Sequence, residues 1–236
     1  MDFAGLTRQS LTDYPGEVAA VLFTRGCNFR CPYCHNPQLV FNDGKKVPSI
    51  TLEEVLEFLE QRKNFIDAVV ISGGEPTLHR ELPGWIRRIK ETNCLVKLDT
   101  NGTNTAMIKE LLEEKLLDYI ALDIKAPMDY KKYQKSCIKI TAAEFFNIRN
   151  TIHLLQNSPV YAEFRTTIVP VIHKAEDIVA IARYLEGSAR YTLQQFNPRI
   201  TLDHKFQSVR PYSQKTMEQI AEQCRPYISE VTLLYS

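Results

Sequence analysis

The chain contains 236 residues, a length that suits one large barrel-like domain with a sizeable core. Hydrophobic residues make up 44% and charged residues 24%, and the formal net charge of +1 gives no overall attraction to nucleic acid or anionic lipid. The longest apolar runs are about as long as a strand, far short of the roughly 20 residues that a membrane-spanning helix needs.

The first residues, Met1-Asp2-Phe3-Ala4-Gly5, lack a basic region followed by an apolar one. We therefore expect a cytoplasmic protein in a reducing compartment, where cysteine thiols stay reduced. The segment 10–16 is polar and ends in Pro15 and Gly16, which is typical of a turn. Asp13 lies in this turn, and its simplest role is to bond to its own backbone.

Three cysteines, Cys27, Cys31 and Cys34, follow the first predicted strand, the apolar run 18–23. They lie on one short loop, which can place three thiolates around a metal. A structural zinc takes four protein ligands and a ferredoxin-type cluster normally takes four cysteines, whereas the local count here is three. A four-iron cluster on three cysteines would leave one iron open to bind something else.

Two other interpretations of the cysteines stay open. His35 could be the fourth ligand of a zinc site. The six cysteines could also be structural thiols or disulfides, although no signal peptide precedes them. Cys94, Cys137 and Cys224 are each isolated in the sequence, and Cys224 shares a helical spacing with apolar neighbours, which predicts a core position.

Strands and helices alternate through the rest of the chain, after a segment at 37–48 that we predict to be irregular and polar. Capping boxes begin two of the helices, at Thr51 and Thr141. The predicted strands after the first are 68–72, 95–99, 119–124, 160–169, 191–196 and 231–235. The predicted helices lie at 51–59, 81–91, 108–112, 141–155, 178–185 and 213–224.

This alternation predicts a parallel sheet with helices outside it. A closed barrel of this type has eight strand-helix units and typically about 250 residues. The present chain offers six units and an extra strand. We therefore predict a single domain over residues 1–236, with an α/β fold in the form of an open, partial TIM-like barrel. An open side wall would admit a macromolecular substrate.

The ends of the predicted strands carry polar residues, and in barrels the working residues lie at the C-terminal ends of strands. The second strand ends in Gly73-Gly74-Glu75-Pro76, where glycine lets the backbone approach a ligand closely and where Glu75 could instead cap the turn. The third ends in Asp99-Thr100-Asn101-Gly102 and the fourth in Asp123-Ile124-Lys125-Ala126-Pro127. These charged groups could bind a ligand or form a salt-bridged rim.

Arg165 lies in the middle of the fifth strand, where a neutral residue would pack better. An inward-facing guanidinium favours a carboxylate, which it binds in bidentate fashion. That carboxylate could belong to a ligand, to Glu163 or to Asp123. Asn197, after the sixth strand, could hydrogen-bond a ligand or only shape its turn.

The cysteine spacing and the Gly73-Gly74-Glu75-Pro76 turn together resemble the radical S-adenosylmethionine (SAM) family. The resemblance implies a [4Fe-4S] cluster on Cys27, Cys31 and Cys34, with its open iron chelated by the amino and carboxylate groups of SAM. It also implies that the glycine turn meets the SAM amino group, that Tyr33 lies beside the adenine and that Lys125 reaches SAM. The residues that we expect to bind the cofactor are Tyr33, Gly73, Gly74, Glu75, Pro76, Asp99, Asn101, Asp123, Lys125, Arg165 and Asn197.

Further motifs resemble the anaerobic ribonucleoside-triphosphate reductase activating proteins, which are glycyl-radical-enzyme activases. The motifs are Asp-x-Pro-Gly at 13–16, Cys-His-Asn-Pro at 34–37, Asp-Ile-Lys-Ala-Pro at 123–127, Phe-Arg-Thr-Thr at 164–167 and Gln-Gln-Phe at 194–196. The resemblance implies that one electron from the reduced cluster cleaves SAM, and that the resulting 5′-deoxyadenosyl radical removes a hydrogen atom from a glycine of a partner enzyme. It places Asp13 and His35 near the bound peptide, and in some activators the positions of Asp99 and Asp123 hold a monovalent cation.

The expected partners are a glycyl radical enzyme, in the first place the anaerobic ribonucleotide reductase, and a low-potential electron donor such as flavodoxin or ferredoxin. Residues 37–48 contain no cysteine, so no second cluster is expected there. The chain could instead activate another glycyl radical enzyme, or be a small-molecule radical SAM enzyme such as a deazaguanine-forming synthase with an enclosed pocket. A non-catalytic metal-binding module would leave the glycine turn and the polar strand ends unexplained.

Overall fold

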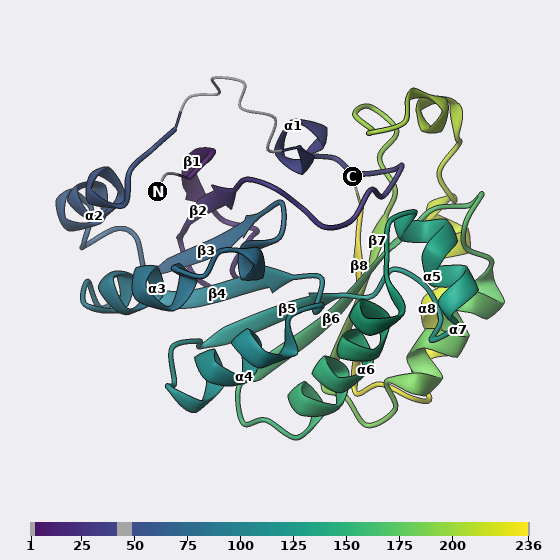
Figure 1. The fold of residues 1–236 in the computed structure, drawn as a ribbon. Coiled ribbons are helices and arrows are strands. Elements are labelled where there is room, and N and C mark those ends of the chain that lie inside the picture. The colour runs from purple at the N-terminus through teal and green to yellow at the C-terminus, as the bar shows by residue number, and fades with distance from the viewer. Residues whose placement is uncertain (1–2, 42–48, 236) are drawn as a thin grey trace.

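The structure, a computed structural model, describes residues 3–41 and 49–235. Its centre is an eight-stranded sheet in which the strands lie in chain order (Figure 1). β1 (Gly5–Ser10) is antiparallel to β2 (Ala19–Thr24), and the later strands are all parallel. These are β3 (Ala68–Gly73), β4 (Leu95–Thr100), β5 (Tyr119–Asp123), β6 (Tyr161–Ile168), β7 (Arg190–Gln195) and β8 (Glu230–Leu234). Within the described residues the sheet is not closed, which confirms the predicted partial barrel.

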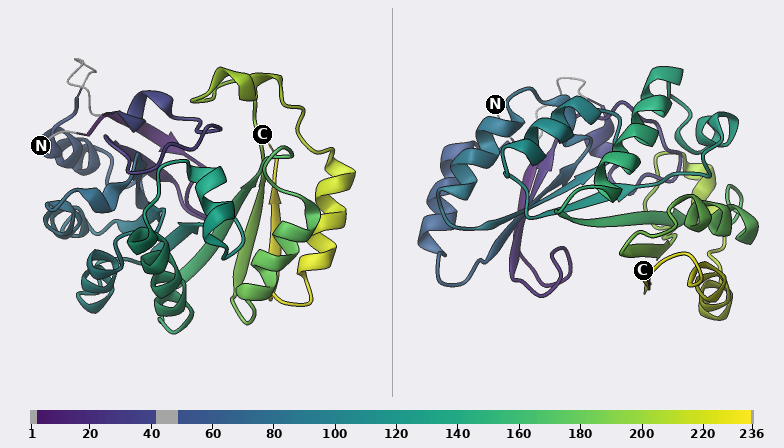
Figure 2. Two further views of the ribbon diagram at one scale, coloured as in Figure 1. Left: turned by 45° about the vertical axis from the view of Figure 1, so that its right-hand side comes forward. Right: turned by 90° about the horizontal axis from the view of Figure 1, so that it is seen from below.

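The longer helices lie along the outer face of the curved sheet (Figure 2). The helices are α1 (Pro37–Val40), α2 (Leu52–Gln61), α3 (Leu82–Lys90), α4 (Thr105–Glu113), α5 (Tyr130–Cys137), α6 (Ala142–Gln156), α7 (Ala175–Tyr184) and α8 (Gln214–Cys224), with short 3-10 helices η1 (Pro76–Leu78) and η2 (His204–Ser208). Both predicted capping boxes are present, at Thr51 with Glu54 and at Thr141 with Glu144. No helix in the described ranges is both long and apolar enough to cross a membrane.

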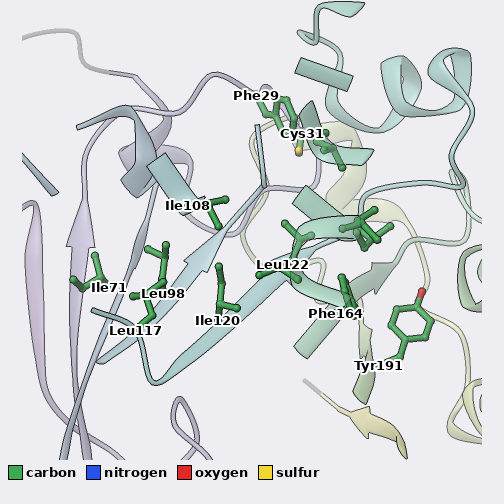
Figure 3. Packing of buried hydrophobic residues seen from close by; sticks show 14 of the residues in the cluster. Phe29, Cys31, Ile71, Leu98, Ile108, Leu117, Ile120, Leu122, Phe164 and Tyr191 are labelled. Atoms are coloured by element: carbon green, nitrogen blue, oxygen red, sulfur yellow. The ribbon is translucent and has the colours of Figure 1, made fainter. Parts of the chain in front are cut away.

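Alternate residues of the central strands pack on opposite faces of the sheet. Ile71, Leu98 and Ile120 belong to the large cluster that includes the helix residues (Figure 3). Val70 and Ala121 belong to a smaller cluster with Tyr14 on the other face. Because both faces are covered at these positions, the strands appear in the sequence as continuous apolar runs, which is why they could be predicted.

Parallel pairing brings the C-terminal ends of the strands together at one edge of the sheet. Thr24 is the register partner of Gly73, and Asp123 that of Arg165. The loops that follow β2, β3, β4 and β5 therefore start side by side. This edge carries most of the residues that the sequence singled out.

The structure contains β1, α1, α5 and the two 3-10 helices in addition to the predicted elements. β1 was not predicted because most of its side chains are exposed or half-buried, so it has no apolar pattern. α5 was not predicted because its only buried side chains are Tyr133, Ser136 and Cys137. Residues 37–40 form α1 rather than irregular structure, because Leu39 and Val40 are buried beneath the cysteine loop, whereas 42–48 lie outside the described residues.

Candidate active site

A cleft of about 210 Å³ lies at the C-terminal edge of the sheet. It is formed by the loop after β2, the turn after β3 and the ends of β4 to β7. The predicted site residues that line it are Cys27, Cys31, Tyr33, Cys34, His35, Gly73, Gly74, Glu75, Asp99, Asn101, Asp123, Lys125 and Arg165. Pro76, Asp13 and Asn197 are not among its lining residues.

The cysteine loop is fixed by backbone hydrogen bonds to α1. The N–H of Gly26 donates to Leu39 O at 2.7 Å and the N–H of Cys27 to Val40 O at 3.2 Å. The Arg30 guanidinium donates to the carbonyl oxygens of Cys27 and Phe29 at 2.6 and 2.7 Å. Three thiols are therefore presented to the cleft from a loop whose backbone is already ordered.

The three thiols differ in their electrostatic surroundings. Burial, with the nearby Glu75 carboxylate, raises the pKa of Cys27 to about 12, and burial also raises the pKa of Cys34. A hydrogen bond with the Cys137 thiol lowers the pKa of Cys31 against the effect of burial, and Lys125 acts in the same direction. Because metal ligands must be thiolates, binding of an iron-sulfur cluster here would release protons.

These residues fit a cluster of several irons held by three thiolates. In the described ranges no three Cys, His, Asp or Glu side chains converge on a position for a single metal ion. The fit rests on the shared cleft, which all three thiols line together with the glycine turn and two cations, Lys125 and Arg165. Such a site offers sulfur ligands on one side and groups for an anionic ligand on the other.

The turn after β3 packs directly on the cysteine loop. Gly73 has φ +117°, and a Cβ atom added to Gly74 would lie 2.0 Å from Gly26 O. The N–H of Glu75 donates to that same carbonyl oxygen at 2.8 Å. Glycine is required here because the two loops that frame the cleft are in backbone contact.

Gly74→Ala should therefore destabilise the fold by about 2 to 3 kcal/mol and reduce iron uptake, because either the turn or the cysteine loop must move. Gly84→Ala is the matched control, since Gly84 is in α3 and a Cβ atom there meets nothing within 4 Å. It should stabilise the fold by roughly 0.5 to 1 kcal/mol. Chemical denaturation and iron assay of both variants measure the difference. Equal stability of the two would contradict this role of Gly74.

Glu75 is 1% exposed and accepts four hydrogen bonds. The donors are the N–H and hydroxyl of Thr77, the hydroxyl of Thr100 and the N–H of Asn101. Burial raises the pKa of this carboxyl against the effect of those donors. Glu75 thus caps η1, which begins at Pro76, and ties the β3 turn to the end of β4.

Four charged side chains form a network at the cleft floor. The Asp123 carboxylate accepts from Lys125 Nζ at 2.9 Å and from Arg165 Nε at 3.0 Å. Arg165 Nη1 also lies 3.3 Å from Asp99 Oδ2, whereas Asp99 Oδ1 has no hydrogen-bond partner among the described residues. Burial and the two carboxylates act in opposite directions on the pKa of Arg165, and the carboxylates dominate and raise it. The network keeps two cations charged beside the thiols.

Asp123 should make the free energy of unfolding fall as the pH drops from about 4 to about 2. Burial opposes ionisation of this carboxyl, but Arg165 and Lys125 outweigh burial and lower its pKa from 3.8 to about 2. As the pH falls, Asp123 in the unfolded chain therefore takes up its proton before Asp123 in the folded chain does. The stabilisation is present above pH 3.8 and is lost as the pH falls through about 2. Its size is about 2 kcal/mol.

Asp123→Asn removes this titration. Denaturant unfolding between pH 4 and pH 2 should give the variant a flatter pH dependence than the wild-type chain. Identical slopes would show that Asp123 is not held ionised by the two cations.

A second cavity of about 580 Å³ adjoins the first and shares His35, Arg165, Thr167 and Gln194 with it. Asp13 and Asn197, which the sequence predicted, line this cavity instead. The Asp13 carboxylate accepts from Ser10 Oγ at 2.5 Å, and the Asn197 side chain accepts from the N–H of Arg199 at 3.0 Å. Both side chains thus make local turn contacts at the rim of the cavity.

Two aromatic groups complete the cleft. The Tyr33 ring is 3% exposed and its hydroxyl has no hydrogen-bond partner within the described residues. The His35 ring lies 6.3 Å from the Phe196 ring, and burial lowers its pKa, with the positive charge of Lys125 adding to that effect. His35 is thus favoured in its neutral form at the junction of the two cavities.

Sequence reasoning missed two residues of this region. Lys97 is 3% exposed, and its ammonium donates to the carbonyl oxygen of Asp13 at 2.6 Å. A lysine within the apolar run 95–98 is the same signal that identified Arg165. Cys137 is fully buried against Cys31, and an isolated cysteine in a polar segment gave no sign of that contact.

A family model described as the radical SAM superfamily matches residues 21–185 of the chain. The chain is 36% identical over 236 residues to a protein of Methanocaldococcus jannaschii whose name assigns it provisionally to the glycyl-radical enzyme activating enzymes, with 98% of this chain and 94% of that protein covered. It is 31% identical over 198 residues to the pyruvate formate-lyase-activating enzyme of Clostridium pasteurianum, with 81% and 79% covered.

Among solved structures, the chain is similar to a radical SAM methyltransferase from Sphaerobacter thermophilus. The TM-score is 0.71 at 17% sequence identity, and the match covers 94% of this chain and 67% of that one. At this identity the likeness concerns the fold alone.

Proposed function

The chain belongs to the radical SAM superfamily and is an enzyme that uses radical chemistry, and from this premise we propose that it generates a glycyl radical on a partner enzyme. The observation that carries the proposal is the junction of the two cavities at His35, Arg165, Thr167 and Gln194. One cavity holds the three thiols, and the other leads from them to the open side of the sheet. A peptide loop in the second cavity would bring a glycine to the first.

The proposal gives each group of site residues a role. Cys27, Cys31 and Cys34 hold a [4Fe-4S] cluster, which when bound supplies the electron for reductive cleavage of SAM. Arg165 and Lys125 provide the positive charge that orients the SAM carboxylate. The Gly73–Gly74 turn would allow backbone groups to approach the SAM amino group, and Tyr33 would pack beside the adenine.

We further propose a monovalent cation near Asp99 and Asp123. The support for it is Asp99 Oδ1, a buried oxygen without a hydrogen-bond partner among the described residues, beside Thr100. The Lys97 ammonium lies 3.8 Å from this oxygen, so it would compete with the cation for Asp99.

The proposed partner is the anaerobic ribonucleoside-triphosphate reductase, supported by the motifs at 13–16, 34–37 and 194–196. The relatives also include a pyruvate formate-lyase-activating enzyme, so the test covers both reductase and lyase. A low-potential donor such as flavodoxin or ferredoxin would supply the electron, in the reducing surroundings of the cytoplasm.

The test is an anaerobic incubation of the reconstituted protein with each candidate partner, SAM and a low-potential reductant. We expect a glycine-centred doublet in the electron paramagnetic resonance spectrum with the reductase. A doublet only with a lyase would correct the partner and keep the activase function. If no partner gave a doublet and a small heterocycle or sugar were turned over instead, the activase proposal would be wrong.

A further inference from the structure

The helix α5 lies directly against the cysteine loop. The N–H of Arg30 donates to Cys137 O at 2.9 Å, and the Cys137 thiol is close enough to that of Cys31 to lower the pKa of Cys31. On the same side of the helix, the buried Tyr133 hydroxyl accepts from the N–H of Lys125 at 3.2 Å. Figures 1 and 2 both show the loop after β2 passing close to α5. The inner side of α5 therefore contacts a cluster ligand and a cation of the cleft.

The outer side of α5 is strongly basic. Residues 129–140 contain four lysines and one acidic residue, Asp129, whereas the whole chain has a net charge of only +1. Lys131, Lys135 and Lys139 are exposed, and none of them has an ion-pair partner in the part of the chain that the structure describes. Lys132 is the exception, because it pairs with Asp177 at 2.5 Å. Three of the four lysines on and just after this helix are thus without an ion pair in the described residues, although Lys135 lines a depression that also contains Glu176 and Asp177.

An exposed apolar residue follows the helix at the point nearest the thiols. Ile138 is 61% exposed and has φ +56°, a left-handed conformation that a β-branched residue rarely adopts. It is covalently attached to Cys137, whose thiol reaches Cys31. Stable interfaces between proteins combine an apolar centre with a polar rim, and Ile138 among the three lysines has this composition.

We propose that the surface formed by Lys131, Lys135, Ile138 and Lys139, the α5 surface, docks an acidic one-electron carrier protein. This proposal rests on the function proposed above in one respect: the cluster must receive an electron from outside the protein. One electron leaves the reduced cofactor of the carrier, which is oxidised, and is taken up by the cluster on the three thiolates, which is reduced. No bond forms or breaks and no proton moves. Ile138, Cys137 and Cys31 provide a short, continuous route from this surface to the cluster.

The positive charge of the α5 surface favours an acidic partner protein. Uncompensated lysines raise the rate of association with an acidic protein and make it sensitive to salt. A carrier seated on α5 also leaves the second cavity free, so a glycyl radical enzyme could use the open side of the sheet at the same time.

The test compares two triple variants with the same change in charge. The first replaces Lys131, Lys135 and Lys139 by glutamate. The control replaces Lys63, Lys109 and Lys215, which are exposed on or beside α2, α4 and α8, by glutamate. Reconstituted proteins are mixed with reduced flavodoxin, without any glycyl radical enzyme, and cluster reduction is followed by stopped-flow absorbance. Flavodoxin binding is measured separately by calorimetry.

At low salt, we expect reduction of the α5 variant by flavodoxin to be at least about tenfold slower than that of wild type, and its binding of flavodoxin to be at least about tenfold weaker. Both differences should shrink at high salt. The control should stay within about twofold of wild type. Dithionite, a small reductant, should reduce all three proteins equally, and equal iron content would show that the variants are folded. A triple glutamine variant should give an intermediate effect.

Equal losses in both triple variants would show a general charge effect and overturn the assignment. Reduction by flavodoxin and binding of flavodoxin that are unchanged in the α5 variant at low salt would also overturn it. Because no glycyl radical is measured, failure here is distinct from failure of the activase proposal.

Discussion

Replacing Cys31 by alanine should abolish cluster binding and all SAM cleavage. Reconstitution of the wild-type chain should give about four irons per protein and a reduced spectrum that changes when SAM is added. The variant keeps only two thiols in the cleft and should retain almost no iron. Iron and sulfide assays with electron paramagnetic resonance measure the loss.

Cys94→Ala is the control for Cys31→Ala. Cys94 is also buried, but it lies outside the cleft, so the variant should keep its full iron content. Stoichiometric zinc in the wild-type protein, with no iron retained after anaerobic reconstitution, would contradict the cluster and return the site to the zinc alternative with His35.

Arg165→Ala should weaken SAM binding by about 100-fold while leaving the cluster in place. A hydrogen bond to a charged group contributes about 1.5 to 3 kcal/mol, and the guanidinium can make two such bonds to the SAM carboxylate. Lys125→Ala should have a smaller effect in the same direction, because its ammonium is a single point charge. Calorimetry with SAM on reconstituted protein measures both.

Arg190→Ala is the matched control, since Arg190 is an arginine on the neighbouring strand β7 that pairs with Glu230 outside the cleft. Its SAM affinity should equal that of wild type. If Arg165→Ala and Lys125→Ala also bind SAM as wild type does, the charged network is a structural rim and the SAM site lies elsewhere.

The parts of the fold that could be predicted are those in which local pattern and tertiary packing agree. The apolar runs in β3 and β5 are covered on both faces of the sheet. The capping boxes at Thr51 and Thr141 supply hydrogen-bond acceptors for backbone N–H groups at the start of their own helices. β1 could not be predicted because it is an edge strand whose mainly polar side chains are exposed or half-buried.

The candidate site could be predicted where its residues form a local motif, as in the cysteine loop and the glycine turn. Contacts between different motifs depend on the register of the strands, so they could not be predicted from a local sequence pattern. Arg165 was expected to find a ligand carboxylate, Glu163 or Asp123, and in the structure it contacts Asp123 and also Asp99. Glu163 instead accepts hydrogen bonds from Tyr119 and Thr192.

The most direct test of the activase proposal follows one hydrogen atom. The partner enzyme is prepared with glycine deuterated at its α-carbon and incubated anaerobically with this protein, SAM and reductant. Mass spectrometry of the 5′-deoxyadenosine should then find one deuterium per molecule, in amounts that match the glycyl radical. 5′-Deoxyadenosine without deuterium, formed at the same rate whether or not the partner is present, would contradict the proposal that this chain takes a hydrogen atom from a glycine of another protein.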